Sequence, residues 1–285
     1  MLQLLASAYS CRVTPPSRLV MTDDCSCMPP EWLEKYAAEE IAQRVEAAAK
    51  TLQITRLLDR KVERLSGGEM QRVSIGRAIV RQPRVFLMDE PLSALDANLR
   101  DVLRVELKKL HNDLGATFVF VTHDQVEAMS MGDKIGVLNR GKLVQVGTPD
   151  EIYTRPVNAF VARSVGTPPM NLMDGEMQGG EAVMQSGAVR LPMGGKARPE
   201  GRKLRFGIRP ENLVLDGGGP AEARVFDVED HGVIKILTLE TPGARLHATV
   251  SAQTKVHLDD TVRFGWKPDK VLVFDPETGR NLDLA

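Results

Sequence analysis

The stretch RLSGGEMQRVSIGRAIVRQPRVFLMDEPLSALD, residues 64–96, decides the fold, because it places a helix directly before a buried strand. A Ser-Gly-Gly turn at residues 66–68 precedes apolar residues at helical spacing, so Ser66 is expected to cap a helix. The four apolar residues 85–88 then predict a parallel strand that is buried on both faces. A helix followed by such a strand is typical of an α/β sheet.

Two adjacent acids, Asp89 and Glu90, follow this strand at the end where open α/β sheets bind ligands. In phosphoryl transfer, one acid at such a position holds Mg²⁺, while a second residue orients or deprotonates the attacking water. A solvated strand end is the plainer alternative. An acid pair directly after four buried apolar residues favours a functional site.

The glycines of the Ser-Gly-Gly turn allow a ligand to approach the backbone, and a helix N-terminus attracts phosphate. A cap and turn without function is the alternative. A second strand, TFVFV at residues 117–121, ends in Thr122, His123 and Asp124. His123 therefore takes the place after its strand that Glu90 takes after the first. An isolated histidine is usually structural, but this position favours a polar contact to a terminal phosphate.

Other segments contribute to the expected core. Apolar residues at helical spacing between Ile41 and Leu52 predict an amphipathic helix. The stretch GVLNRGKL, residues 136–143, is one residue away from the phosphate-loop pattern G-x-x-x-x-G-K-[ST]. Leu143 replaces the hydroxyl that would bind magnesium, and apolar residues flank Asn139-Arg140-Gly141 on both sides. This stretch is therefore predicted to be a hairpin, not a phosphate loop.

Composition places the chain among soluble globular proteins, with 42% hydrophobic residues, 26% charged residues and a net charge of −1. Nothing in this balance indicates a nucleic-acid surface. The apolar runs are far shorter than the roughly 20 residues of a bilayer span, so any membrane association is expected to come through a partner. The N-terminus is a poor secretory signal, and the protein is expected in the cytosol. The three cysteines, all within residues 1–37, are expected to be reduced surface thiols.

In this order, the motifs resemble those of ATP-binding cassette (ABC) ATPases. LSGGEMQR resembles their signature, VFLMDEP their Walker B strand, SALD their D-loop and VTHD their switch histidine. The resemblance covers residues 38–285 and is greatest to importer ATPases of the maltose and glycerol-phosphate type. It implies an α/β fold, the C-terminal part of a P-loop ABC cassette followed by an OB-like β-barrel regulatory domain. The implied domains are an unmatched segment 1–37, the cassette 38–165 and the OB-like domain 166–285.

Residues from 203 onward alternate apolar and polar side chains between Gly, Pro and Asp turns, which is typical of a small barrel or sandwich. By resemblance this is the regulatory domain of such importer ATPases. A dimerisation and stability module is favoured over a regulator or small-ligand site, because no ligand constellation occurs there.

The resemblance also implies roles for single residues, with ATP and Mg²⁺ as cofactors. Asp89 positions magnesium, Glu90 is the base toward the attacking water, and His123 contacts the γ-phosphate. The residues implied to bind nucleotide are Ser66, Gly67, Gly68, Gln71 and Asp96. The first three contact ATP held by a second subunit, and Asp96 couples the two sites.

The implied partners follow from the same family. They are a second ATPase subunit in a head-to-tail dimer, transmembrane permease subunits and, indirectly, a solute-binding protein; no nucleic acid is expected. The chain would lie peripherally on the cytoplasmic face of the inner membrane. It would energise uptake of a small solute, a carbohydrate or polyol.

One element of the family pattern is absent from the sequence. No G-x-x-x-x-G-K-[ST] loop precedes the signature, and Gly195-Lys196 is followed by Ala197. Residues 1–37 are therefore expected to derive from a truncated gene or a shifted reading frame, and the chain alone is expected to show no turnover. Two alternatives to an importer ATPase follow: a catalytically inactive interaction subunit, and a truncated or frameshifted product without function.

Overall fold

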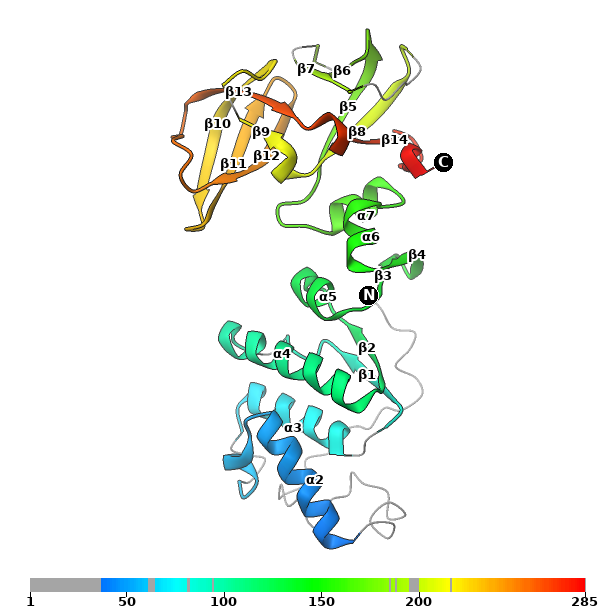
Figure 1. Cartoon of the computed structure of the whole chain (residues 1–285), viewed down its shortest axis with the longest axis vertical. Helices are drawn as coiled ribbons and strands as arrows, with labels where there is room; N and C mark the ends of the chain where they lie inside the picture. The colour runs from blue at the N-terminus through cyan, green and yellow to red at the C-terminus, as the bar shows by residue number, and fades with distance from the viewer. Residues whose placement is uncertain are drawn as a thin grey trace. The chain divides into compact units, whose positions relative to one another are not determined.

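The computed structural model describes residues 37–60, 65–80, 83–93, 95–184, 186–187, 189–194, 200–215 and 217–284. The chain divides into two compact units, Met1–Met131 and Gly132–Ala285. Figure 1 labels the helices and strands of both units. The segment 1–37, expected to be unmatched, lies almost entirely outside the described residues.

The first unit is α/β, as predicted, with helices before, between and after its two strands; the helix between them was not predicted. Its elements are α2 (Ala38–Thr51), the 3₁₀ helix η1 (Thr55–Leu57), α3 (Gly67–Val80), β1 (Val85–Asp89), α4 (Ala97–Leu114), β2 (Thr117–Val121) and α5 (Gln125–Met131). Strands β1 and β2 pair in parallel, from Val85 opposite Thr117 to Asp89 opposite Val121. The carboxyl ends of the two strands therefore lie side by side (Figure 1).

One hydrophobic core holds this unit together. Helix α2 buries Val45, Ala48 and Ala49, as its spacing predicts. The ring of Phe86 on β1 stacks on that of Phe118 on β2, with centroids 4.3 Å apart. Buried residues of α3 and α4 join the same cluster, so the helices pack on one face of the strand pair.

The prediction that residues 85–88 are buried on both faces is wrong for the described part of the chain. Phe86 and Met88 are buried, but Val85 is 51% exposed and Leu87 is 77% exposed. Among the described residues, β1 and β2 form a two-stranded sheet. Successive side chains of a strand point to opposite faces, and the helices cover only the face that carries Phe86.

The second unit begins with the predicted hairpin. Strands β3 (Ile135–Asn139) and β4 (Lys142–Gly147) pair in antiparallel fashion. The two turn residues have positive φ, 49° at Arg140 and 77° at Gly141. Two successive residues of this kind form the tight turn that suits the twist of paired strands. The phosphate-loop interpretation of this stretch is thereby excluded, as expected.

Two helices and two antiparallel sheets follow. The elements are α6 (Pro149–Thr154), α7 (Ala159–Ser164), β5 (Asn171–Gln178), β6 (Glu181–Met184), β7 (Arg190–Pro192), β8 (Lys203–Ile208), η3 (Pro210–Asn212), β9 (Leu213–Val214), β10 (Ala221–Asp230), β11 (Ile234–Thr241), β12 (Ala244–Ser251), β13 (Thr261–Trp266), η4 (Pro268–Lys270), β14 (Leu272–Phe274) and η5 (Leu282–Leu284). The strand orders are β12-β11-β10-β13-β9 and β14-β8-β5-β6-β7. The predicted β-rich tail is confirmed, but β5, β6 and β7 were not predicted from the sequence.

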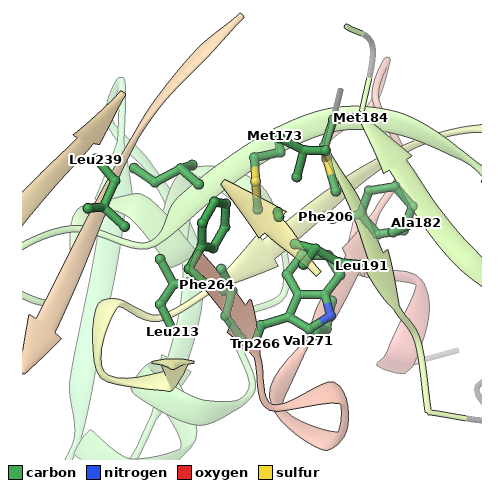
Figure 2. Packing of buried hydrophobic residues seen from close by; sticks show 14 of the residues in the cluster. Met173, Ala182, Met184, Leu191, Phe206, Leu213, Leu239, Phe264, Trp266 and Val271 are labelled. Atoms are coloured by element: carbon green, nitrogen blue, oxygen red, sulfur yellow. The ribbon is translucent and has the colours of Figure 1, made fainter. Parts of the chain in front are cut away.

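The two five-stranded sheets share one core. Figure 2 shows Phe206 of β8 and Phe264 and Trp266 of β13 among aliphatic and methionine side chains from both sheets. Phe206 and Phe264 are fully buried. The indole N–H of Trp266 donates to the carbonyl of Pro192 at 2.8 Å, which satisfies its polar atom inside the apolar packing.

A buried arginine attaches α6 and α7 to the β-rich part. The guanidinium of Arg209 donates to the carbonyls of Ala162 and Val165 at the end of α7, and to that of Tyr153 in the last turn of α6. It lies 3.9 Å from the centre of the Tyr153 ring. The last carbonyls of a helix lack partners within the helix and favour a cation. Arg209 therefore serves two helix ends at once.

The second compact unit begins at Gly132, so it includes residue 166, where the sequence analysis expects the OB-like domain to begin. The Arg209 contacts tie residues 153–165 to the sheets of this unit. Asn281, near the end of the chain, likewise donates to the carbonyl of Pro156 at 2.7 Å.

We expect Phe86→Ala to lower the free energy of unfolding of the first unit by about 3–5 kcal/mol, since it removes a buried ring and leaves a cavity. The neighbouring substitution Leu87→Ala, on the exposed face of the same strand, should cost less than about 1 kcal/mol. Chemical denaturation followed by far-UV circular dichroism measures both. Equal losses for the two variants would show that both faces of β1 are packed.

We expect Arg209→Met to destabilise the second unit by about 2–4 kcal/mol, because it strips buried carbonyls of their donor. Arg205→Met is the matched control. Arg205 makes a half-exposed bidentate pair with Asp174 at 2.6 and 3.0 Å, and such pairs contribute about 0–1 kcal/mol. Urea unfolding followed by Trp266 fluorescence, in a Trp32→Phe background, compares the two variants. A larger loss in the control would contradict the role of Arg209.

Candidate functional site

The Ser-Gly-Gly turn at residues 66–68, the signature turn, precedes α3 and is fixed by two reciprocal capping hydrogen bonds. The backbone N–H of Ser66 donates to Glu69 Oε2 at 3.0 Å, and the backbone N–H of Glu69 donates to Ser66 Oγ at 3.3 Å. A Cβ at Gly67 would meet nothing within 4 Å, so this turn is open to a ligand. The predicted cap by Ser66 is confirmed. The part played by Glu69 was missed, although the S-x-x-E spacing of a capping box signals it.

The backbone N–H of Ser66 is the main cause that lowers the pKa of Glu69, and the Ser66 hydroxyl and Arg56 add to it. Arg56 Nη2 lies 3.0 Å from Glu69 Oε1. A carboxylate held in this way remains ionised at pH values below the ordinary pKa range of glutamate. The turn therefore carries a fixed negative charge beside the N–H groups of the first helical turn.

The residues that follow β1 and β2 lie together. Glu90 Oε1 lies 3.0 Å from His123 Nδ1, across the carboxyl ends of β1 and β2. Both side chains are accessible to solvent, with 47% of Glu90 and 75% of His123 exposed. Asp89 is the last residue of β1 and is exposed. The structure thus brings Asp89, Glu90 and His123 to one edge of the strand pair.

The backbone of Glu90 has an unusual conformation, with a φ of 44°. Its N–H donates to the carbonyl of Val121 at 2.8 Å. Its carbonyl accepts from Ser93 Oγ at 3.0 Å and from Gln71 Nε2 at 2.9 Å. A left-handed residue other than glycine costs about 1–3 kcal/mol, and such residues cluster at functional sites. The amide of Gln71, expected to bind nucleotide, thus has a partner within its own chain.

The loop that carries His123 is fixed by its neighbours. Thr122 Oγ1 donates to the buried Glu127 at 2.7 Å. Asp124 Oδ1 accepts from the backbone N–H groups of Val126 and Glu127, at 2.7 and 3.2 Å, and so caps α5. Arg100 Nη1 lies 3.6 Å from Asp124 Oδ2. Sequence patterns gave no signal for Arg100.

Asp96, implied to couple two nucleotide sites, is the N-cap of α4. Its Oδ1 accepts from the backbone N–H of Leu99 at 3.0 Å. Arg100 also donates to the carbonyl of Leu95 at 3.1 Å, so one side chain joins the D-loop to the switch-histidine loop. Ala94, within the same loop, lies outside the described residues.

The strand-end carboxylates fit a magnesium ion that is shared with phosphate. Mg²⁺ keeps several waters and binds through one or two carboxylates plus substrate phosphates. The exposed Asp89 offers such a ligand. In the parts of the chain that the structure describes, no three His, Cys, Asp or Glu side chains gather as a complete metal cage.

Comparison with known proteins identifies these features. Three family models match: the ABC transporter model over residues 10–93, the MalK OB fold domain over 166–213 and the TOBE domain over 206–274. The chain is 46% identical over 245 residues to the sn-glycerol-3-phosphate import ATP-binding protein UgpC of Ruegeria sp., which covers 85% of this chain and 69% of that relative. The chain belongs to the family of ABC transporter ATP-binding proteins.

Two further relatives are also named as import ATP-binding proteins. The trehalose/maltose import ATP-binding protein MalK of Thermococcus litoralis is 44% identical over 262 residues, or 87% of this chain and 70% of the relative. The xylose/arabinose import ATP-binding protein XacK of Haloferax volcanii is 46% identical over 255 residues, or 85% of this chain and 65% of the relative.

The family matches bear on the expected domains. The MalK OB match begins at residue 166, where the boundary was predicted. The ABC transporter match begins at residue 10, inside the segment 1–37 that was expected to match nothing. No helix within the described ranges combines the length and apolar character needed to cross a membrane.

We expect Glu69→Gln to melt at a lower temperature than the unmodified chain at pH 6, because the variant lacks the charge that the Ser66 cap favours. The lowered pKa of Glu69 sets the sign. The stabilisation that ionised Glu69 contributes is fully present above the ordinary glutamate pKa of about 4.3. It is lost as the pH falls through the lower pKa that Glu69 has in the folded state. Thermal melts between pH 6 and 3 should show the two curves converge. A gap that persists at pH 3 would contradict this assignment.

Proposed function

We propose that this chain is the ATP-binding and ATP-hydrolysing subunit of an importer that takes up a carbohydrate or polyol. One observation carries the proposal: the carboxylate of Glu90 contacts His123, beside Asp89, at the paired ends of β1 and β2. The close relatives, each named as an import ATP-binding protein, support it. The chain would work peripherally, on the cytoplasmic face of the inner membrane.

In the proposed chemistry, Glu90 accepts the proton of the water that attacks the γ-phosphate. A general base must lie within hydrogen-bonding reach of that proton, and Glu90 is exposed at the strand end. His123, which lies 3.0 Å from Glu90, keeps its other ring nitrogen for a phosphate oxygen. Asp89 would hold Mg²⁺, which neutralises charge on the phosphates.

The signature residues would act on a different nucleotide. Ser66, Gly67 and Gly68 form an open turn at a helix N-terminus, which suits a phosphate brought by a second ATPase subunit. A head-to-tail dimer pairs this turn with the partner's strand-end acids. Asp96 and Arg100 fix the loop that precedes α4. The proposed coupling between the two nucleotide sites therefore runs through the start of α4.

The solute class follows from the relatives as a group. Their names give glycerol phosphate, trehalose or maltose, and xylose or arabinose. All of these are polyhydroxylated compounds. Permease subunits and a solute-binding protein would recognise the solute, and the C-terminal sheets would act as a module for dimerisation and stability.

The signature function can be tested in a mixed transporter. This chain is paired with a UgpC-type relative and its permease subunits, and the relative's own signature serine is changed to arginine. Surviving Mg²⁺-dependent hydrolysis then requires the signature of this chain. We expect Ser66→Arg to lower kcat by about 100-fold or more, since losing one preorganised donor can have that effect. Ser74→Arg, on an exposed position of the same helix, is the control and should leave kcat unchanged.

The Walker B half is tested by the reciprocal pairing, in which the relative's catalytic glutamate is changed to glutamine. The proposal expects hydrolysis that is lost on Glu90→Gln and retained on Glu39→Gln. This arm is the more demanding one, because the G-x-x-x-x-G-K-[ST] pattern does not occur in the sequence. Hydrolysis in the first pairing only would reduce the chain to an interaction subunit that supplies a signature.

A further inference from the structure

The direction of the Glu90 carboxylate depends on two peptide planes. The plane before Glu90 is fixed by its N–H, which donates to the carbonyl of Val121 at 2.8 Å. The plane after it is fixed by its carbonyl, which accepts hydrogen bonds. The φ and ψ angles of a residue are the rotations between these planes, so holding both planes sets the direction of the side chain.

The second plane is difficult to hold, because it joins Glu90 to Pro91. Proline has no N–H, and only the Glu90 carbonyl is available for hydrogen bonds. Proline also restricts the residue before it, normally to extended conformations, yet Glu90 has a φ of 44°. This conformation persists only where the surroundings impose it.

Two residues bring donors to this carbonyl. Ser93 donates through its hydroxyl at 3.0 Å and through its backbone N–H at 3.3 Å, and it belongs to the same loop as Glu90. Gln71 Nε2 donates at 2.9 Å from α3. Among the donors that the described residues bring to the Glu90 carbonyl, Gln71 alone comes from another element, helix α3.

We infer that Gln71 is a positioning residue, which holds the Glu90 backbone in its left-handed conformation and so aims the carboxylate at His123. The inference rests on the proposed role of Glu90 as the base. Gln71 lies in the second turn of α3, whose first turn follows Ser66. A displacement of the signature turn therefore moves the donor that fixes Glu90. One helix thus links the turn that serves the partner's nucleotide to the carboxylate of its own chain.

The test measures hydrogen exchange at the amides of Glu90 and Ser93 in the full chain, without nucleotide. Three variants separate hydrogen bonding from packing. Gln71→Ala removes both, Gln71→Glu keeps the shape but has no donor at neutral pH, and Gln71→Lys keeps a donor in a different shape. We expect exchange about 3- to 10-fold faster in the first two variants, and nearly unchanged in the third.

Met70→Ala is the matched control, because Met70 is the preceding residue of α3 and is 43% exposed. Its exchange at Glu90 and Ser93 should equal that of the unmodified chain. Slow exchange preserved in Gln71→Glu would assign Gln71 to packing and overturn the inference, as would exchange unaffected in Gln71→Ala.

Activity supplies a second readout. In the mixed transporter that depends on Glu90, Gln71→Ala should lower kcat and leave the KM for ATP unchanged, because the base is misdirected while ATP binding persists. A raised KM with an unchanged kcat would overturn the positioning role. Absence of hydrolysis with unmodified Gln71 would contradict the proposed function instead, and the exchange result would still decide the role of Gln71.

Discussion

The parallel register of β1 and β2 is the constraint on which the site depends. Pairing Asp89 with Val121 places Glu90 and the loop of His123 one step beyond neighbouring strand ends. The N–H of Glu90 then extends the ladder by one hydrogen bond, to the carbonyl of Val121. A slip by one residue would turn Phe86 and Met88 out of the core, because side chains alternate between faces. The same apolar residues therefore fix both the fold of this unit and the meeting of Glu90 with His123.

Periodicity and end signals predicted many elements of both units, and they placed Glu90 and His123 each at the end of a strand. That the two side chains meet depends on the pairing of β1 with β2, which the sequence analysis did not predict. The second face of β1 could not be predicted in this way. An apolar run shows that a strand can be buried, whereas its neighbours decide whether it is. Strand β5 was missed because Gly175 interrupts its alternation; a Cβ there would lie 2.3 Å from the carbonyl oxygen of Val183. Strands β6 and β7 are only four and three residues long, which is too short for alternation to reveal them. Local spacing revealed the Ser66 cap, but the contact of Gln71 with Glu90 depends on tertiary packing between α3 and the β1 loop.

In the second unit, too, sequence patterns did not indicate a contact on which the packing depends. Nothing in the sequence around Arg209 indicates a buried cation, yet its guanidinium joins the ends of α6 and α7 to the strand it follows. Burial lowers the pKa of Arg209, and the nearby Tyr153 and Glu211 oppose that shift. Burial raises the pKa of Tyr153 to about 12, and its hydrogen bond to Glu211 adds to the shift. Tyr153 therefore remains a neutral ring against the cation, and the helices and sheets pack as one compact unit.

The choice of residue at position 90 is itself evidence about function. Glycine would adopt a φ of 44° without strain, and it is the usual residue wherever a chain needs that conformation. Glutamate is strained there, and Pro91 adds a further restriction. The fold compensates with hydrogen bonds from Gln71 and Ser93 and to Val121. None of these bonds uses the Glu90 side chain, whose carboxylate is left for His123 and for solvent. A strained residue whose exposed carboxylate contacts His123 supports the proposed role of Glu90, because proton transfer from an attacking water requires that carboxylate.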